Sequence, residues 1–272
     1  MNKINKTGNK ESHISQIKTL IFDGGGTIWD SSQSIYESYL WGFRQLGLNF
    51  ALPAEACHHL RGLRDFNTSA GIAKALLWAS NSFERGKYPL FLEKPGANSY
   101  LKEEIRKYKK ENVSFLKLAG RLARLFDDYL YNKIKDTDYT LLPYTAEILK
   151  TLHRKNYQIV MLSIRHYASV KRILRHHKLH VYFSHIFSTE SFQEGGKTKE
   201  AVKDALETLM QTPENILWIG DSGVDISCAK EAGIFAAGVL TGLANRQTLL
   251  DEGADWILDD IGGLKDILQI DS

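Results

Sequence analysis

Three aspartates follow predicted strands, where their carboxylates could act together on one ligand. Asp23 comes directly after the apolar run Ile17–Phe22, and Asp221 and Asp225 follow a second apolar run that ends at Gly220. Parallel strands bring their carboxyl ends to one edge of a sheet, so we expect the three side chains to meet there. Carboxylates gathered in this way repel one another unless a cation lies between them. Oxygen ligands without His or Cys favour Mg²⁺, which also suits a phosphate group.

The residues around these aspartates fit a ligand site better than a purely local role. Asp23 is followed by Gly24, Gly25 and Gly26, which lack Cβ atoms and so permit unusual backbone conformations and close approach by a ligand. A single aspartate at the end of a strand most often caps the next helix. An FDGGGT turn and a WIGDSGVD turn in one chain, in this order, favour the ligand site instead.

The second half of the chain alternates between predicted strands and helices. This alternation predicts a parallel sheet covered by helices on both faces. The strand at residues 17–22 must join that sheet, because alone it has nothing to bury against. The fold class is therefore α/β, a doubly wound parallel sheet. Its other strands are expected at Gln158–Leu162, His185–Ser188, Ile216–Ile219, Phe235–Leu240 and Trp256–Leu258.

Residues 32–140 have a different pattern. Apolar residues recur there at helical spacing, and β-branched runs are few, so this region is expected to be all helical. The charged stretch 102–110 is interpreted as a solvated helix face, and residues 83–98 as a long loop. The predicted division of the chain is a flexible polar leader at 1–16, an α/β core at 17–31 and 141–272, and an inserted helical domain at 32–140.

Composition narrows the class of protein further. The chain has 272 residues, of which 43% are hydrophobic and 25% charged, as in an ordinary globular protein. A formal net charge of +3, spread along the chain, does not indicate nucleic-acid binding. Cys57 and Cys228 form no CxxC motif, which suits a reducing compartment. With no apolar stretch of membrane-spanning length, we expect a cytoplasmic protein with no membrane partner. The sequence predicts no particular oligomeric state.

Four short motifs, in order, resemble those of the haloacid dehalogenase (HAD)-like hydrolase superfamily. They are FDGGGT at 22–27, a strand ending in Ser163, Gly196-Lys197 before a helix, and GDSGVD at 220–225. The resemblance covers essentially the whole chain after residue 16. It indicates the branch that contains phosphoglycolate phosphatases and phosphonatases, in which a type-1 helical cap is inserted where residues 32–140 lie. The resemblance thus implies a Rossmann-like core with a helical cap.

The resemblance implies a role for each motif residue. Asp23 would attack phosphorus and form an aspartyl phosphate. Ser163 would hydrogen-bond the transferred phosphoryl group, and Lys197 would neutralise its charge. The implied ligands of Mg²⁺ are Asp23, Asp221 and the backbone carbonyl of Gly25, with Asp225 supporting the metal or its water. Residues expected around the substrate are Gly24, Gly26, Thr27, Arg61, Arg64, Ile164 and Arg165.

Gly25 departs from the family pattern. Phosphatases of this family carry a second aspartate two residues after the nucleophile, at the position that Gly25 occupies here. That aspartate protonates the leaving oxygen and then activates water, and such a group typically contributes about 10²–10⁴-fold in rate. A metal ligand supplied by the backbone carbonyl should survive the change, whereas the general acid and base should not.

Three hypotheses follow from this departure. The favoured one is a Mg²⁺-dependent hydrolase of small phosphorylated metabolites. It would use a substitute acid, such as Asp30, His58 or His59, or a substrate with a good leaving group. A second is a catalytically weak or inactive phosphate-binding or regulatory protein. Dehalogenation is disfavoured, because those enzymes work without a metal.

The third hypothesis is phosphonate cleavage, which in this family needs a cap lysine to form a Schiff base. The segment at 60–65 resembles the cap loop that faces the active site, and it offers Arg61 and Arg64 where a lysine is wanted. A guanidinium cannot form an imine, and Lys74 is expected on the following helix. The two arginines could instead bind a distal anion of the substrate, with plain exposed arginines as the equal alternative.

Overall fold

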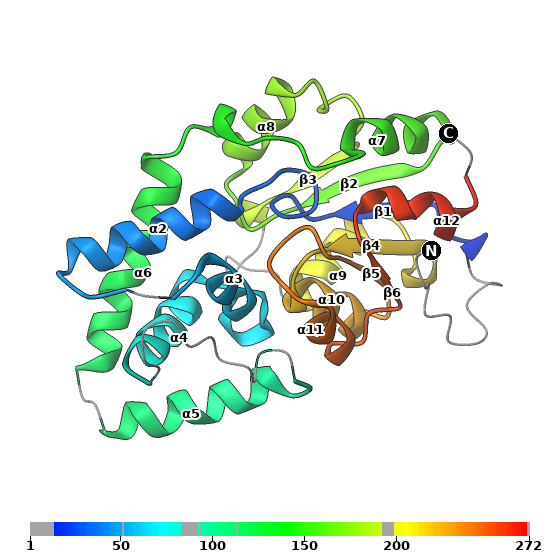
Figure 1. The fold of residues 1–272 in the computed structure, drawn as a ribbon. Helices are drawn as coiled ribbons and strands as arrows, with labels where there is room; N and C mark the ends of the chain where they lie inside the picture. The colour runs from blue at the N-terminus through cyan, green and yellow to red at the C-terminus, as the bar shows by residue number, and fades with distance from the viewer. Residues whose placement is uncertain are drawn as a thin grey trace.

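The fold is built on one parallel β-sheet. The computed structural model describes residues 14–50, 52–82, 92, 94–111, 114–191 and 199–270. The sheet has six strands in the order β3-β2-β1-β4-β5-β6, and every neighbouring pair is parallel (Figure 1). The strands are β1 (Thr19–Phe22), β2 (Gln158–Leu162), β3 (His185–Phe187), β4 (Ile216–Gly220), β5 (Phe235–Val239) and β6 (Trp256–Leu258).

Helices cover both faces of the sheet, so the strands are apolar on both sides. In β1, Leu20 and Phe22 face one hydrophobic cluster, whereas Ile21 faces another. This alternation follows from the two-residue period of a strand, and burial of both faces is typical of parallel sheets. The first cluster includes helices α7 (Thr145–Arg154), α8 (Tyr167–His176) and α12 (Leu264–Leu268). The second includes α9 (Lys199–Leu209), α10 (Gly223–Glu231) and α11 (Arg246–Asp251).

A separate group of helices lies between β1 and β2 in the chain. We call residues 32–132 the helical segment. Its side chains form their own hydrophobic cluster, in which Tyr39 and Phe126 are fully buried and lie edge to face at 4.9 Å. The segment contains α2 (Ser32–Gln45), α3 (Ala54–Gly62), the 3₁₀ turn η1 (Arg64–Phe66), α4 (Ser69–Ser82), α5 (Ala97–Glu111) and α6 (Phe115–Asn132).

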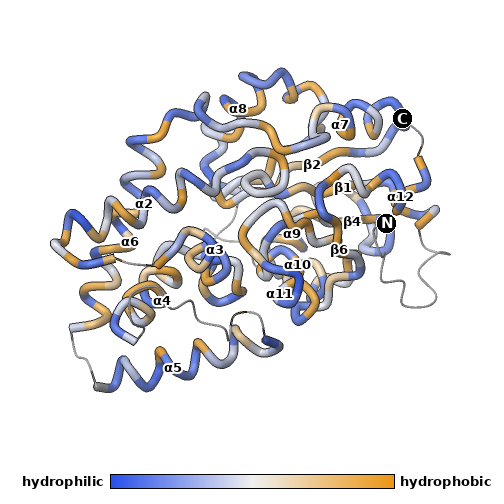
Figure 2. Tube along the Cα trace, viewed as in Figure 1, coloured by the Kyte–Doolittle hydropathy of each residue, from blue (hydrophilic) through white to orange (hydrophobic). Residues whose placement is uncertain are grey.

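Helix α5 shows why a strongly charged stretch can still be part of this fold. Leu101 and Ile105 are buried against the rest of the segment, and the charged residues between and after them face outward. Two of the charged residues form ion pairs with acids three positions earlier on the exposed face, at 2.7 and 2.9 Å. Figure 2 shows the resulting hydrophilic outer face of α5. The interpretation of residues 102–110 as a solvated helix face is confirmed.

The two connections between the helical segment and the sheet run side by side. The backbone N–H of Asp30 donates to the carbonyl of Thr140 at 2.8 Å, and that of Leu142 donates to Ile28 at 3.0 Å. Trp29 and Leu141 form an isolated antiparallel bridge between these bonds. The chain therefore leaves the sheet and returns to it at one place.

The α/β fold class with helices inserted after the first strand is confirmed. The expected strands end within one residue of those observed, and the described part of residues 32–132 is helical between its turns. The loop predicted at 83–98 lies mostly outside the described residues, and its last two residues belong to α5. Residues 1–13 of the predicted leader also lie outside them, while Ile14 packs against the sheet's first cluster.

Among the described residues, no helix combines the length and the apolar character needed to cross a bilayer.

Replacing Phe126 by Ala is expected to lower the free energy of unfolding by about 3–5 kcal/mol, because its ring is fully buried in the cluster of the helical segment. Leu116→Ala on the same helix is the control, since Leu116 is 42% exposed and should change stability by less than about 0.5 kcal/mol. Urea unfolding followed by circular dichroism measures both. Equal losses in the two variants would contradict this packing.

Candidate active site

The three predicted aspartates meet at the carboxyl edge of the sheet. Asp23 follows β1 and Asp221 follows β4, and these strands are neighbours, with the N–H of Asp23 bonded to the carbonyl of Ile219 at 2.9 Å. Asp225 lies in the first turn of α10. One carboxylate oxygen from each lies within 4.8 Å of the others, and the exposed fractions of the three residues are 8%, 1% and 0%.

Two glycines make room for the Asp221 carboxylate, because they have no side chain. A Cβ atom at Gly242 would lie 1.9 Å from Oδ2 of Asp221, and one at Gly26 would lie 2.3 Å from the same oxygen. Gly26 also has a φ of +80°, which glycine adopts without strain. The same oxygen accepts a hydrogen bond from the backbone N–H of Leu243 at 2.8 Å. The carboxylate therefore occupies space that only a glycine at these two positions leaves free, and a backbone hydrogen bond holds it there.

Asp225 caps the start of α10 and also belongs to the carboxylate cluster. Its Oδ2 accepts hydrogen bonds from the backbone N–H of Ser222 at 3.2 Å and from the Ser222 hydroxyl at 2.6 Å, which forms a capping box at the start of α10. Gly220 makes room for it, because a Cβ atom there would lie 2.4 Å from the Cβ of Asp225. Helix capping thus holds this carboxylate in the cluster.

The donor set fits a divalent cation. Three buried carboxylates this close are costly without a counter-charge, and all three offer hard oxygen ligands. Such a set suits Mg²⁺ or Mn²⁺ better than the softer metals that select thiolate or imidazole ligands.

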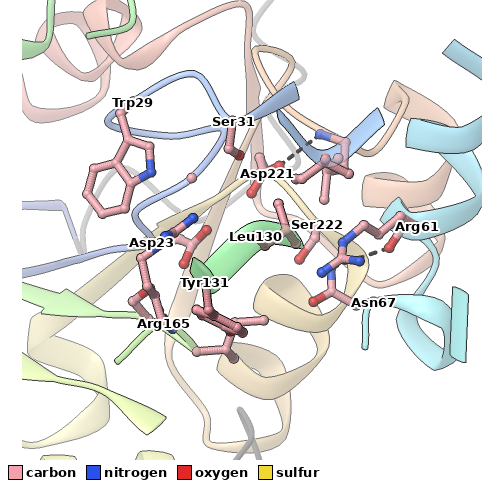
Figure 3. Close-up of a pocket in the computed structure, with 15 residues that line it drawn as sticks. Asp23, Trp29, Ser31, Arg61, Asn67, Leu130, Tyr131, Arg165, Asp221 and Ser222 are labelled. Carbon is pink, nitrogen blue, oxygen red and sulfur yellow. Dashed lines mark hydrogen bonds between the residues drawn. The ribbon is translucent and has the colours of Figure 1, made fainter. Parts of the chain in front are cut away.

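A pocket of about 90 Å³ opens beside the carboxylates, between the sheet edge and the helical segment (Figure 3). Figure 3 shows Arg61 and Asn67, from the helical segment, on the opposite side of the pocket from Asp23 and Trp29. The lining residues are Asp23, Gly25, Trp29, Ser31, Ile35, Arg61, Asn67, Leu130, Tyr131, Ser163, Ile164, Arg165, Asp221, Ser222 and Leu243.

Arg61 brings a buried positive charge to this pocket. The residue is only 6% exposed, and its guanidinium donates to the hydroxyl of Tyr39 at 3.3 Å. Burial raises the pKa of Tyr39 to about 12, against the opposing effect of Arg61, so this hydroxyl stays neutral and does not balance the charge. Among the residues that the structure describes, no carboxylate lies within ion-pair distance of Arg61. An anionic ligand would supply the missing counter-charge.

Arg165 lies beside the pocket in a fixed orientation. Its guanidinium donates to the hydroxyl of Tyr139 at 2.7 Å and to that of Ser169 at 3.2 Å, and it lies 3.7 Å from the carboxylate of Asp136. Its backbone N–H donates to the hydroxyl of Ser163 at 3.2 Å, which turns that oxygen toward the loop after β2. Ser163 and Arg165 are thus placed together by one short loop.

The family model of haloacid dehalogenase-like hydrolases matches residues 17–233, most of the chain. The chain belongs to this family. The resemblance inferred from the four motifs is therefore confirmed, and so is the expectation that this HAD-like hydrolase is an enzyme.

Relatives of this HAD-like hydrolase include phosphatases. Phosphoglycolate phosphatase from Salmonella typhi is 25% identical over 253 residues, covering 92% of each chain. A pyrophosphatase from Anoxybacillus flavithermus is 30% identical over 128 residues, covering 46% of this chain and 59% of its own. The solved structure of a predicted phosphatase from Clostridium acetobutylicum aligns with a TM-score of 0.66 at 19% identity, covering 93% of this chain and 99% of its own, so it shares the fold.

Several residues expected around the substrate of this HAD-like hydrolase do not line the pocket. Gly24 packs under the indole of Trp29, and Gly26 packs against Asp221. Thr27 is fully buried, and its hydroxyl has no hydrogen-bond partner within the described part of the chain. Arg64 turns away to form an ion pair with Glu231 on α10. Lys197 lies outside the described residues, at 192–198.

The candidates for a substitute acid also lie away from the pocket. The carboxylate of Asp30 accepts hydrogen bonds from the backbone N–H and the hydroxyl of Ser32, at 2.8 and 2.6 Å, at the start of α2. His58 contacts the carbonyl of Ser32 at 3.0 Å, and burial lowers its pKa. Neither they nor His59 line the pocket.

The structure adds pocket residues that the motifs did not indicate. Trp29 and Ser31 come from the loop after Gly25, and Asn67 follows the arginines of the helical segment. Leu243 reaches the hydrophobic cluster of the helical segment from the sheet edge, and Tyr131 projects from the end of α6. Trp29, Ser31 and Asn67 lie close to quoted segments in the sequence, but proximity does not predict the direction of a side chain. Tyr131 lies near none of these segments, so no sequence signal pointed to it.

Gly242→Ala is expected to weaken divalent-cation binding by about 10–100-fold, because its methyl group would displace the Asp221 carboxylate. Gly120→Ala is the matched control, since a Cβ atom at Gly120 would meet nothing within 4 Å. Calorimetric titration with Mn²⁺ measures both affinities. Wild-type affinity in Gly242→Ala would show that the fit around Asp221 does not support metal binding.

Proposed function

We propose that this chain is a Mg²⁺-dependent phosphatase of small phosphorylated metabolites that acts through an aspartyl phosphate on Asp23. The observation that supports this most is the placement of three buried carboxylates on one side of a small pocket and a buried arginine on the other. A phosphorylated compound that carries a second anionic group matches this arrangement of charge.

The metal would be held by Asp23 and Asp221, with the backbone carbonyl of Gly25 and with Asp225 in support. When bound, Mg²⁺ would offset the negative charge of the carboxylates and of the phosphoryl group. The protein's own contribution is to keep these oxygens in place before substrate arrives, through the backbone bond to Asp221 and the helix cap at Asp225.

Asp23 is proposed as the nucleophile because it lines the pocket at the end of β1, within the carboxylate cluster. Ser163 follows the neighbouring strand β2 and lines the same pocket, so its hydroxyl is proposed to donate to a phosphoryl oxygen. Lys197 keeps the role that the family motif gives it, which is to neutralise charge on the phosphoryl group.

The helical segment is proposed to act as a cap over the site, and residues 17–31 and 141–272 as the core. The cap supplies Arg61, Asn67 and Tyr131 to the pocket. It rests closely on the core, since a Cβ atom at Gly62 would lie 2.6 Å from the backbone of Ala244, and Arg64 binds Glu231. Closure of this kind excludes water until the phospho-aspartate forms.

Phosphonate cleavage is not supported by these residues. No lysine lines the described pocket, and the cap position facing the carboxylates holds Arg61. Lys74 belongs to α4 and does not line the pocket. The relatives named phosphoglycolate phosphatase agree with a small anionic phosphate ester as the substrate, and the relative named pyrophosphatase agrees with an anhydride.

Asp23→Asn is expected to lower phosphate release with Mg²⁺ to background, because an amide cannot act as the nucleophile. Asp266→Asn is the control, since Asp266 is exposed on α12, outside the pocket. A panel of phosphorylated metabolites is assayed with the three proteins. Inert wild type that still binds Mg²⁺ and phosphate would favour the phosphate-binding alternative over the enzyme.

Arg61→Gln is expected to raise KM for an anionic substrate by about 10–100-fold with a smaller change in kcat, because it removes a buried charge used in binding. Arg64→Gln is the comparison, because Arg64 is already bound to Glu231 and should leave KM within about twofold. Steady-state kinetics on the best substrate of the panel measures both. A rise in KM for Arg64→Gln alone would reverse the two roles.

A further inference from the structure

Two polar groups fill the space beside Gly25 that an acidic side chain would need. A Cβ atom at Gly25 would lie 2.7 Å from the hydroxyl oxygen of Ser31 and 3.6 Å from the indole Nε1 of Trp29. Both residues line the pocket. An aspartate at position 25 therefore does not fit unless Ser31 moves. The side chains of Trp29 and Ser31 and the absence of a side chain at Gly25 depend on one another.

The indole N–H of Trp29 is a buried hydrogen-bond donor beside the pocket. Trp29 is 1% exposed, and its Nε1 has no hydrogen-bond partner among the residues that the structure describes. Figure 3 shows the nitrogen edge of the ring turned toward Ser31 and the pocket. Buried donors are normally satisfied, so an oxygen of a bound ligand is the expected partner.

The loop holds this indole rigidly. The backbone N–H groups of Ile28 and Trp29 donate to the carbonyl of Gly24 at 2.8 and 3.1 Å, and that of Gly26 donates to the carbonyl of Trp29 at 2.8 Å. The ring lies directly against Gly24, where a Cβ atom would be 2.2 Å from it. A donor fixed in this way costs no reorganisation when charge develops on its acceptor.

The other groups of the described pocket have different tasks. Its carboxylates are Asp23 and Asp221, and both belong to the metal cluster. The hydroxyl of Ser222 donates to Asp225 at 2.6 Å. Burial raises the pKa of Tyr131, so its hydroxyl stays protonated and is a weak acid. Hydrogen bonding, rather than proton transfer, is what Trp29 and Ser31 can offer a leaving oxygen.

We infer that Trp29 and Ser31 donate hydrogen bonds to the oxygen that leaves phosphorus, and that the preferred substrates are therefore acyl phosphates or phosphoanhydrides. The leaving groups of these compounds, a carboxylate or a phosphate, depart as stable anions without being protonated. Alkyl phosphates release an alkoxide, which needs a proton. This inference rests on the proposed phosphatase function and specifies its substrate.

The reaction balances without a general acid. A carboxylate oxygen of Asp23 forms a bond to phosphorus, and the bond from phosphorus to the leaving oxygen breaks, with its electron pair going to the leaving anion. Water then attacks phosphorus, and the bond to Asp23 breaks, which restores the carboxylate. One hydrogen of the attacking water stays on the new P–OH group, and the other passes to another oxygen of the departing phosphate, which leaves as dihydrogen phosphate. The second step is itself the hydrolysis of an acyl phosphate.

The test compares leaving groups. With Mg²⁺, kcat/KM is measured for acetyl phosphate, inorganic pyrophosphate, 4-nitrophenyl phosphate, phenyl phosphate and 2-phosphoglycolate. Wild type is expected to prefer pyrophosphate, which like 2-phosphoglycolate carries a second anionic group for Arg61, over 2-phosphoglycolate by about 10²-fold or more in kcat/KM. Acetyl phosphate lacks that second group and is expected to exceed 2-phosphoglycolate by the same factor in kcat, the rate that a general acid normally supplies. The ratio of the rates for acetyl phosphate and pyrophosphate shows whether acyl phosphates or phosphoanhydrides are the better substrates.

Trp29→Phe and Ser31→Ala test the donors. Each is expected to lower kcat/KM by about 10-fold for 4-nitrophenyl phosphate and more for phenyl phosphate, because more negative charge develops on the poorer leaving oxygen. A merely structural role would lower both rates by the same factor. Ser31→Thr keeps the hydroxyl and should restore the wild-type slope of rate against leaving-group pKa.

A double variant, Gly25→Asp with Ser31→Ala, introduces the acid where space has been made for it. It should raise activity on 2-phosphoglycolate and reduce the preference for acetyl phosphate. Wild type that hydrolyses 2-phosphoglycolate as fast as acetyl phosphate would overturn the inference and leave the phosphatase proposal intact. If wild type instead releases phosphate from none of these substrates faster than Asp23→Asn does, the proposed function itself is overturned.

Discussion

Repulsion among three buried carboxylates is the constraint on which this structure depends. Asp23, Asp221 and Asp225 place oxygens within 4.8 Å of one another. Water cannot screen them, because the residues are almost wholly buried. The fold keeps them together through the pairing of β1 with β4, a backbone donor to Asp221 and a helix cap on Asp225. The sheet, the backbone donor and the helix cap thus hold together three side chains whose like charges repel one another.

The remaining features of the site complement this cluster of carboxylates. Arg61 is buried on the far side of the pocket, where an anionic ligand would lie between it and the carboxylates. The glycines at positions 26, 220 and 242 are needed less for flexibility than for the space that the carboxylate side chains occupy. The helical segment completes the pocket, but its own hydrophobic cluster keeps it a separately packed layer.

The sequence predicted the sheet and the carboxylates well, because both depend on regular patterns. Apolar runs located the strands, and the rule that ligands bind beyond their carboxyl ends brought Asp23 and Asp221 together. The region around Gly25 was less predictable. Its missing side chain was evident, but the groups that take its place lie four and six residues further on, and a folded loop brings them back.

The two arginines show which structural features a local sequence pattern does not determine. Arg61 and Arg64 are three residues apart and looked equivalent in the sequence. The first lies at the end of α3 and turns inward, whereas the second lies in the next turn and binds Glu231. Their difference depends on where a helix ends and on which acid lies opposite, and neither can be obtained from local pattern alone.

The paired connections at Trp29 and Leu141 have a consequence for how such a protein can change over generations. Because the chain departs from the sheet and comes back at one point, whatever lies between is a module with adjacent ends. Insertions, deletions or wholesale exchange of that module leave the strand order and the carboxylates untouched. Substrate specificity can therefore evolve at a different rate from the chemical reaction. Related proteins can come to bind different substrates while the reaction at the carboxylates stays the same.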